Sequence, residues 1–185
     1  MSLHLATPLD SERLVVRGVQ HSDLPDLLRM NGDDAVTRFL PYDTWASLAD
    51  GEAWIARMFA MADAGSALQL VIVDKASTSA IGTCLIFRHD VASARAEIGY
   101  ALARSWWGRG FMREALSVLI RHAFEVYELH RLEAEVDPDN DASNALLRKL
   151  GFTCEGRLRQ RWLAKGRRYD TNVYGLLSDE WRGRS

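Results

Sequence analysis

The segment AEIGYALARSWWGRGFMREAL, residues 96–116, decides the fold of this chain. Its opening residues alternate, so that Ile98, Tyr100 and Leu102 share one face of a strand. Its closing residues begin a helix over 111–127, in which apolar side chains recur at helical spacing. The short stretch between them carries two glycines one residue apart. The segment therefore predicts a strand that turns tightly into a helix.

The hydrophobic pattern predicts further elements on both sides of this segment. Alternating or continuous apolar runs predict strands over 13–19, 67–74, 81–88, 130–136, 154–163 and 169–177. Helical spacing and capping residues predict helices that begin at Ser22, run from Ser47 to Gly65, and cover 141–150 after Asn140. The irregular stretch over 33–44 is expected to be a loop or short helices.

The order of these elements restricts the topology. Strands joined by short turns must be antiparallel, because a parallel return needs a crossover of about a dozen residues or more. The strand–helix–strand section over 96–136 permits a parallel pair. No linker or repeat divides the chain, so we expect one domain over residues 1–185. The predicted fold class is α/β (α+β), with a mixed, mostly antiparallel central sheet and helices on both faces.

Composition and charge exclude several kinds of protein. Apolar residues make up 48% and charged residues 26%, which is typical of a globular domain. The formal net charge of −2 gives no basic field for nucleic acid or for a membrane surface. Cys84 and Cys154 show no metal-ligand spacing, and no apolar run has the length of a signal peptide. We therefore expect a cytoplasmic protein with no metal, no nucleic-acid partner and no membrane partner.

The loop before the helix has the features of an anion-binding site. Gly108 and Gly110 lack a Cβ, so backbone N–H groups there can point at a ligand. The helix N-terminus adds about half a positive charge, which suits a pyrophosphate. A dinucleotide fold fits poorly because Arg113 stands where a third glycine is needed, and no Gly-Lys-Ser/Thr follows for a P-loop. On these residues alone, a plain glycine-rich turn is the alternative.

Several motifs in the chain belong together. They are Ala96-Glu97-Ile98-Gly99-Tyr100, Trp107 through Ala115, Asn140-Asp141-Ala142-Ser143, Lys149-Leu150-Gly151-Phe152, and the flanking Ser11-Glu12-Arg13-Leu14 and Tyr174-Gly175-Leu176-Leu177. In this order they resemble the GNAT acetyltransferases. More narrowly, they resemble the RimJ/RimL type, whose best-known members acetylate the N-terminal amine of ribosomal proteins. The resemblance covers nearly the whole chain.

The resemblance implies acetyl-CoA as cosubstrate and a parallel strand pair that splays at the cofactor site. The glycine loop would cradle the pyrophosphate through its backbone, and the strand edge would pair with the pantetheine arm. The cofactor-binding residues that it implies are Tyr100, Ala101, Leu102, Trp107, Gly108, Arg109, Gly110, Phe111, Met112 and Asn140. The chain departs from the family at Ser105, where Gln or Arg is usual, so the backbone is expected to bind without that side chain.

Acetyl transfer to an amine is helped by a base, because an ammonium has no lone pair. Near neutral pH, deprotonation costs about 4 kcal/mol for a lysine side chain and under about 1 kcal/mol for an α-amine. Glu97 is the candidate base, since it lies on the sheet face opposite Ile98 and Tyr100, where a partly apolar setting raises the pKa of a carboxylate. The family match indicates the same residue. A structural ion pair is the alternative role for Glu97.

Ser143 is the candidate acid. It shares a helix face with Leu146 and Leu150, so its hydroxyl needs a partner, and the departing CoA thiolate could be one. Many GNAT proteins have a tyrosine one turn later, where this chain has Leu147, and the RimJ/RimL type has a serine that matches Ser143. The alternative is a serine that bonds back to the preceding turn of its own helix.

The acceptor is expected to be a protein N-terminal α-amine. The alternatives are a small amine, such as a polyamine, an amino-acid-like metabolite or an aminoglycoside, and a non-catalytic acyl-CoA-binding module. Loop position and family analogy make Tyr42 and Trp45 candidates for the acceptor pocket. The basic run over 157–168 is expected to be a solvated hairpin with alternating faces. Family analogy also suggests a homodimer.

Overall fold

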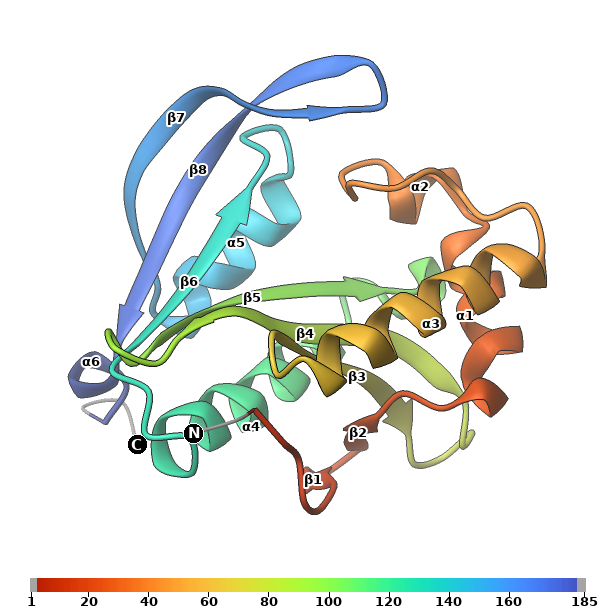
Figure 1. Ribbon diagram of the computed structural model, residues 1–185, viewed down its shortest axis with the longest axis horizontal. Coiled ribbons are helices and arrows are strands. Elements are labelled where there is room, and N and C mark those ends of the chain that lie inside the picture. Colours follow the sequence, from red (N-terminus) through yellow and green to blue (C-terminus); the bar gives the residue numbers. More distant parts are fainter. Residues whose placement is uncertain (1–2, 183–185) are drawn as a thin grey trace.

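Eight strands form one open sheet in the computed structural model, which describes residues 3–182. The sheet order is β1-β2-β3-β4-β5-β6-β8-β7, so the strands up to β6 lie beside their neighbours in sequence (Figure 1). The described strands are β1 (Leu9–Asp10), β2 (Leu14–Gly18), β3 (Ala67–Asp74), β4 (Ala80–Asp90), β5 (Arg95–Leu102), β6 (Arg131–Val136), β7 (Thr153–Ala164) and β8 (Arg167–Leu177). Neighbouring strands are antiparallel except β5 and β6, which are parallel. The predicted mixed, mostly antiparallel sheet is confirmed.

The parallel pair opens shortly after it begins. Among the described residues, β5 and β6 pair over three positions, of which the last is Glu97 opposite Glu133. Beyond this point β5 follows β4 to Leu102, and β6 follows β8 to Val136, so the two halves of the sheet diverge (Figure 1). The predicted splayed pair is confirmed, and Glu97 lies at the start of the opening.

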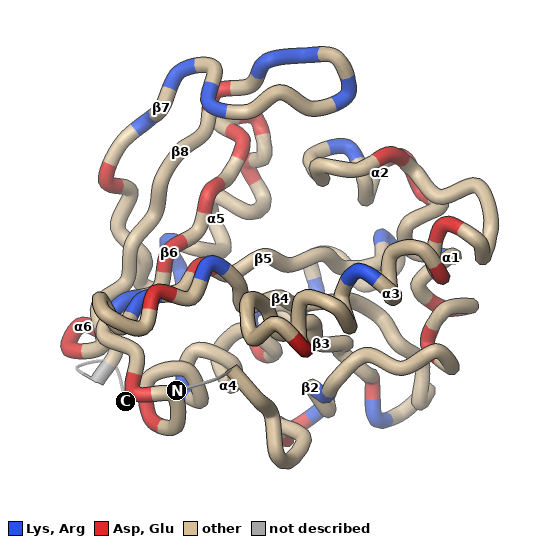
Figure 2. The backbone as a smooth tube through the Cα atoms, in the orientation of Figure 1, with Lys and Arg blue, Asp and Glu red and all other residues tan. Residues whose placement is uncertain are grey.

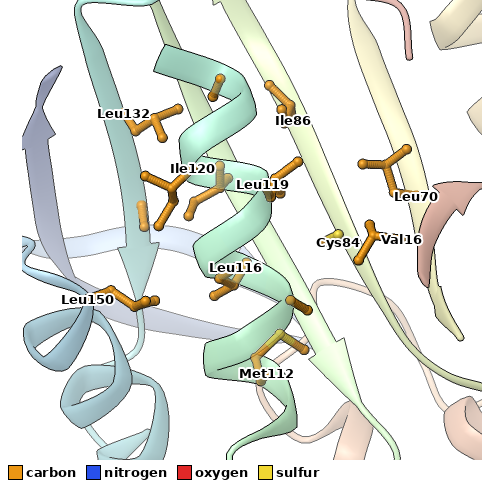
Figure 3. Packing of buried hydrophobic residues seen from close by; sticks show 14 of the residues in the cluster. Val16, Leu70, Cys84, Ile86, Met112, Leu116, Leu119, Ile120, Leu132 and Leu150 are labelled. Carbon is orange, nitrogen blue, oxygen red and sulfur yellow. The ribbon is translucent and has the colours of Figure 1, made fainter. Parts of the chain in front are cut away.

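Helices cover both faces of the sheet. The described helices are α1 (Leu24–Asn31), α2 (Asp34–Thr37), α3 (Leu48–Asp63), α4 (Phe111–Glu125), α5 (Asp141–Leu150) and α6 (Ser178–Arg182), with 3-10 turns η1 (His21–Asp23) and η2 (Arg104–Trp106). On one face, α4 packs Leu116, Leu119 and Ile120 against the strands in the larger core (Figure 3). On the other face, α1 and α3 build a second core around Leu27 and Ile55. This arrangement confirms helices on both faces.

The first helix begins later than the sequence predicts. We expected Ser22 at its N-cap, but Ser22 lies inside η1, which Gln20 and Asp23 cap reciprocally. Asp23 also accepts hydrogen bonds from Arg17 of β2, so its carboxylate is fixed by the sheet. α1 therefore starts only at Leu24. The contact between Arg17 and Asp23 decides where α1 starts. It joins a strand to a turn, so local helical spacing does not predict it.

Two short elements were not predicted, and one uncertain stretch is now defined. β1 has two residues and α6 has five, which is too short for a periodic pattern to show. The stretch over 33–44 holds the short helix α2 and irregular chain, as expected. Ser47 and Asp50 form the predicted capping box at the start of α3.

The β7–β8 hairpin reaches from one half of the sheet toward the other (Figure 1). Its turn is Lys165-Gly166, with φ of 49° and 70°, which suits a tight two-residue hairpin. At the tip, Lys165 Nζ donates a hydrogen bond to the carbonyl oxygen of Thr37 over 2.7 Å. Because β8 pairs with β6 and Thr37 ends α2, the hairpin connects the two sides of the opening.

Candidate active site

The glycine loop presents a row of backbone N–H groups at the start of α4. Gly108 and Gly110 have φ of 70° and 81°, a region that L side chains rarely adopt, and Gly110 caps the helix. Among the described residues, no backbone acceptor bonds the N–H groups from Gly108 to Arg113. The side chains of Phe111 and Met112 are buried in the core, so these residues can offer a ligand their backbone. The loop has the groups that the predicted pyrophosphate site requires.

An ion pair that sequence analysis missed ties this loop to the sheet. Glu114, in the first turn of α4, accepts hydrogen bonds from Arg13 N and Nε, both over 2.7 Å, and from Ser11 Oγ over 2.8 Å. Arg13 Nη1 donates to the carbonyl oxygen of Arg109 over 3.2 Å, and its guanidinium lies 4.0 Å from the ring centroid of Phe111. Arg13 and Glu114 are 101 residues apart, so no local pattern pairs them.

β5 has an open backbone edge beside the loop. Past Glu97, the edge of Tyr100, Ala101 and Leu102 that faces β6 pairs with no strand among the described residues. Trp107 Nε1 donates to the carbonyl oxygen of Leu102 over 2.7 Å, while the Trp107 residue remains 46% exposed. Trp107 therefore joins the loop to the strand edge. A ligand that carries amide groups can bond to this edge as a further strand would.

Two asparagines hold the start of α5. Asn140 caps the helix, because its Oδ1 accepts a hydrogen bond from the backbone N–H of Ser143 over 3.2 Å. Asn144 is 3% exposed and donates from Nδ2 to three backbone carbonyls at and before the cap. Its Oδ1 accepts hydrogen bonds from Asn172 and Tyr174 of β8. Sequence analysis missed Asn144, and this network fixes Ser143 relative to the sheet.

Ser143 and Tyr100 bring two hydroxyl groups together on the α4–α5 side of the sheet. The Tyr100 hydroxyl is buried and has no hydrogen-bond partner among the described residues. Burial raises the pKa of Tyr100 above its usual range, and the nearby Ser143 hydroxyl opposes this shift. The alternative role of Ser143 was a hydrogen bond from its Oγ back to the preceding turn of α5. Among the described contacts, Ser143 Oγ makes no such bond. Since a buried hydroxyl without a partner costs about 1–3 kcal/mol, a ligand that supplies one is favoured here.

Glu97 lies on the opposite face of β5, where β5 and β6 part. Its side chain is 8% exposed, and its Oε2 accepts a hydrogen bond from Arg88 Nη1 over 2.6 Å. Burial raises the pKa of Glu97, Arg88 opposes this rise, and repulsion from Glu135 and Glu133 adds to it. The shift has the direction expected of a general base. Glu97 also forms the ion pair that was its alternative role.

Arg88 connects Glu97 to a second carboxylate, Glu135 on β6, which sequence analysis missed. Arg88 Nη1 lies 3.3 Å from Glu135 Oε1, and Trp162 Nε1 of the hairpin donates to Glu135 Oε2 over 2.6 Å. The Arg88 guanidinium is 5.2 Å from the ring centroid of Trp162, and Arg161 lies 3.6 Å from Glu135. We call Arg88, Glu97, Glu135 and Trp162 the carboxylate cluster. Figure 2 shows acidic residues along β6 and basic residues along the hairpin.

Two β-bulges place the side chains of the carboxylate cluster. In β4, the register with β5 shifts around Arg88, which has φ of 51°. In β7, the register with β8 shifts around Gln160, which has φ of 50° and directly precedes Arg161 and Trp162. A positive φ is uncommon for residues with side chains, and bulges near active sites re-aim side chains. The second bulge also interrupts the alternation that we expected along the basic run of β7.

Tyr42 and Trp45 lie on the Glu97 face, since Ala101 packs against the same second core. Trp45 is 7% exposed and packs against Trp54, with ring centroids 5.6 Å apart. Tyr42 is half buried, and its hydroxyl donates to Asn31 Oδ1 over 3.0 Å. Trp45 is thus part of the core beneath this loop, whereas Tyr42 is only half buried.

Within residues 3–182, no group of three His, Cys, Asp or Glu side chains is arranged to hold a metal ion. Over the same residues, the structure contains no helix with the length and apolar character needed to span a membrane. Cys84 is buried, Cys154 is exposed, and both are free thiols.

Comparison with known proteins agrees with this geometry. The family model described as acetyltransferase (GNAT) domain matches residues 13–153. An uncharacterized N-acetyltransferase of Bacillus licheniformis is 35% identical over 175 residues, which covers 95% of this chain and 98% of that protein. The ribosomal-protein-serine acetyltransferase of Escherichia coli is 34% identical over 99 residues, covering 54% and 55%. RimJ of Mycobacterium smegmatis, solved with CoA-disulfide, has a TM-score of 0.81 at 26% identity, covering 90% of this chain and 83% of that chain.

Proposed function

Because the chain belongs to the GNAT acetyltransferases and is an N-acetyltransferase, we propose that it moves the acetyl group of acetyl-CoA to a protein N-terminal α-amine, with Glu97 as general base. The position of Glu97 at the opening between β5 and β6 carries this proposal. A thioester that extends from the glycine loop along the free β5 edge ends beside that carboxylate. The amine approaches from the opposite face of the sheet.

The cofactor contacts follow from the groups that lack partners. We assign the pyrophosphate to the backbone of Trp107 through Met112, with Arg109 adding charge at the rim. The edge of Tyr100, Ala101 and Leu102 would pair with the pantetheine arm, and Asn140 would lie beside it. The buried Tyr100 hydroxyl and the Ser143 hydroxyl would face the sulfur end of that arm.

The reaction balances with two proton movements. The acceptor ammonium gives one proton to the Glu97 carboxylate, directly or through a water. The freed lone pair then forms a C–N bond to the thioester carbon, and a backbone N–H near Tyr100 stabilises the oxyanion. When the C–S bond breaks, its electron pair leaves on sulfur, and the thiolate takes the remaining surplus proton of the amine with Ser143 orienting it. The products are the amide, CoA thiol and one proton that Glu97 returns to solvent.

The α-amine acceptor has two supports. The relative from Escherichia coli is named for a ribosomal protein acceptor. In addition, an α-amine costs under about 1 kcal/mol to deprotonate near neutral pH, against about 4 kcal/mol for a lysine side chain. A carboxylate such as Glu97 is a modest base and suits the easier proton.

We propose that residues 1–185 form one catalytic domain, because both cores pack against the same sheet. Tyr42 is the better placed of the two acceptor-pocket candidates, because Trp45 is buried in the core. The homodimer and the cytoplasmic location stay predictions.

A thiol-release screen with acetyl-CoA tests the proposed function. The panel contains peptides with a free N-terminal alanine or serine, the same peptides with a capped N-terminus, polyamines and aminoglycosides. We expect release with the free peptides and none with the capped ones. Release with polyamines or aminoglycosides alone would assign a small-molecule acceptor. CoA uptake without release would favour a binding module, and no uptake of CoA in a titration would overturn the proposal.

A further inference from the structure

We propose that the carboxylate cluster binds the acceptor amine as an ammonium ion, and that Arg88 holds the place of that ammonium between Glu97 and Glu135 until the acceptor arrives. This inference deepens the proposed function and rests on it. It assigns a specificity role to Glu135 and Trp162. It also names the ligand class, a primary alkylammonium.

The contact with Arg88 conflicts with the proposed role of Glu97 as a general base. A general base must accept a proton, but Arg88 donates a hydrogen bond to Glu97 Oε2 over 2.6 Å. A guanidinium in that place favours the charged carboxylate and lowers its affinity for a proton. Glu97 becomes a competent base when Arg88 moves away and the acceptor ammonium takes its contacts.

The cluster has the chemistry that recognises an alkylammonium. The side chains of Glu97 and Glu135 are 8% and 12% exposed, so two nearly buried carboxylates face each other across one cation. Two such carboxylates need a cation between them, because like charges close together disfavour ionisation. The ring of Trp162, 5.2 Å from the cation, adds a cation–π contact. An ammonium can replace the guanidinium with the same partners and the same charge.

Arg88 is the member of the cluster that can leave. Its side chain is 41% exposed, and it sits in a β-bulge with φ of 51°. Such backbone strain is often found at functional switches. Glu135 keeps its hydrogen bond from Trp162 and its neighbour Arg161 when Arg88 departs. The site therefore keeps its shape during the exchange.

The chain offers matched controls for both charges. Arg95 has a side chain that is 40% exposed, almost the same as Arg88, and its Nη1 lies 2.9 Å from Glu133. Glu133 lies on β6 two residues before Glu135 and does not contact Arg88 or Trp162 among the described ion pairs and hydrogen bonds. The Arg95–Glu133 pair lies on the same side of the sheet as the Arg88–Glu135 pair, but it is outside the carboxylate cluster.

Steady-state kinetics of four variants test the inference. The acceptor probes are spermidine and a short peptide with a free N-terminal alanine. We expect Glu135→Gln to raise the acceptor KM by about tenfold, since hydrogen bonds to charged groups contribute about 1.5–3 kcal/mol. We expect Arg88→Gln to lower the acceptor KM by about threefold, because the acceptor no longer competes with an internal cation. We expect the two control variants, Arg95→Gln and Glu133→Gln, to change the acceptor KM less than Arg88→Gln or Glu135→Gln does.

The signs of these changes decide the outcome. An unchanged or higher acceptor KM in Arg88→Gln, or an unchanged KM in Glu135→Gln, would overturn the inference while leaving the proposed function intact. If the wild-type protein releases thiol with neither spermidine nor the peptide, the proposed function fails for these acceptors, and the inference falls with it. If Arg88→Gln does not fold, Glu135→Gln carries the test. Arg88→Lys is the charge control, because it keeps the cation and should retain a KM near that of the wild type. CoA affinity and thermal unfolding of each variant identify any general damage.

Discussion

The glycine loop and the carboxylate cluster lie on either side of the same opening in the sheet, yet they are built in opposite ways. The loop is one short run of chain that offers backbone N–H groups, and its glycines give the necessary φ angles. The cluster takes one side chain from each of four strands, and two bulges aim them. The loop should therefore be sensitive to changes of backbone freedom, and the cluster to changes of charge.

The largest expected effect comes from Glu97, the proposed general base. Glu97→Gln removes the proton acceptor while keeping the shape of the side chain. We expect kcat to fall by about 10²- to 10⁴-fold, the usual contribution of a general base. The affinity for CoA, measured by titration, should not change, because the loop is not involved. An unchanged kcat would remove Glu97 from the mechanism and leave the cluster as a structural ion network.

The second largest expected effect is on the pH dependence, which should differ between kcat, which depends on the carboxylate cluster, and CoA binding, which depends on the glycine loop. The proposed base, Glu97, works as a carboxylate, so we expect protonation to remove activity as the pH falls. Since burial raises the pKa of Glu97, the loss should begin at a higher pH than for an exposed glutamate, whose pKa is about 4.3. Below that pKa, kcat should fall by about tenfold per pH unit. Glu135→Gln removes repulsion from Glu97 and should move this limb to lower pH, whereas CoA binding should show no such limb.

A single methyl group should damage the loop. Gly110→Ala places a Cβ at φ of 81°, which costs about 1–2 kcal/mol, so CoA affinity should fall by about 5- to 30-fold. Gly166→Ala in the hairpin turn is the matched control, because Gly166 has φ of 70° and open space around it. It should lower thermal stability to a similar extent and leave CoA affinity unchanged. Equal CoA affinity in both variants would show that the loop backbone does not bind the cofactor.

The smallest expected effect is at the contact that joins the hairpin to α2. Lys165→Met removes the hydrogen bond to the carbonyl oxygen of Thr37. Loss of one partly exposed hydrogen bond is worth about 0.5–1 kcal/mol, so the acceptor KM should rise by about two- to fivefold. CoA affinity should stay the same. A change in CoA affinity without a change in acceptor KM would contradict the assignment of the hairpin to the acceptor side.

The parts of the molecule that sequence analysis predicted are the local ones. Strict alternation along residues 96–102 placed Glu97 on the face opposite Tyr100, as the structure has it. The spacing of Gly108 and Gly110 before an amphipathic helix located the loop. These features need only a few neighbouring residues, so a single sequence contains them.

The parts that sequence analysis missed depend on long-range contacts. Glu135 is one of three polar residues that alternate along β6, and its pattern does not differ from that of a solvated strand. Arg88 and Trp162 contact Glu135 because of the two bulges. Neither bulge contains a glycine, so the sequence gives no local sign of a positive φ there. Trp45 sits in an irregular loop, and sequence alone could not show that it is buried.

The order of strands in the sheet also bears on how the protein is made. From β1 to β6 each strand lies beside the one before it, but β8 must insert between β6 and β7. Folding domains emerge from the ribosome with the N-terminal part first. The residues proposed to hold the coenzyme precede β8, whereas Trp162 is fixed in place by pairing with β8. A nascent chain is therefore expected to gain the means to hold the coenzyme before it gains the means to choose a substrate.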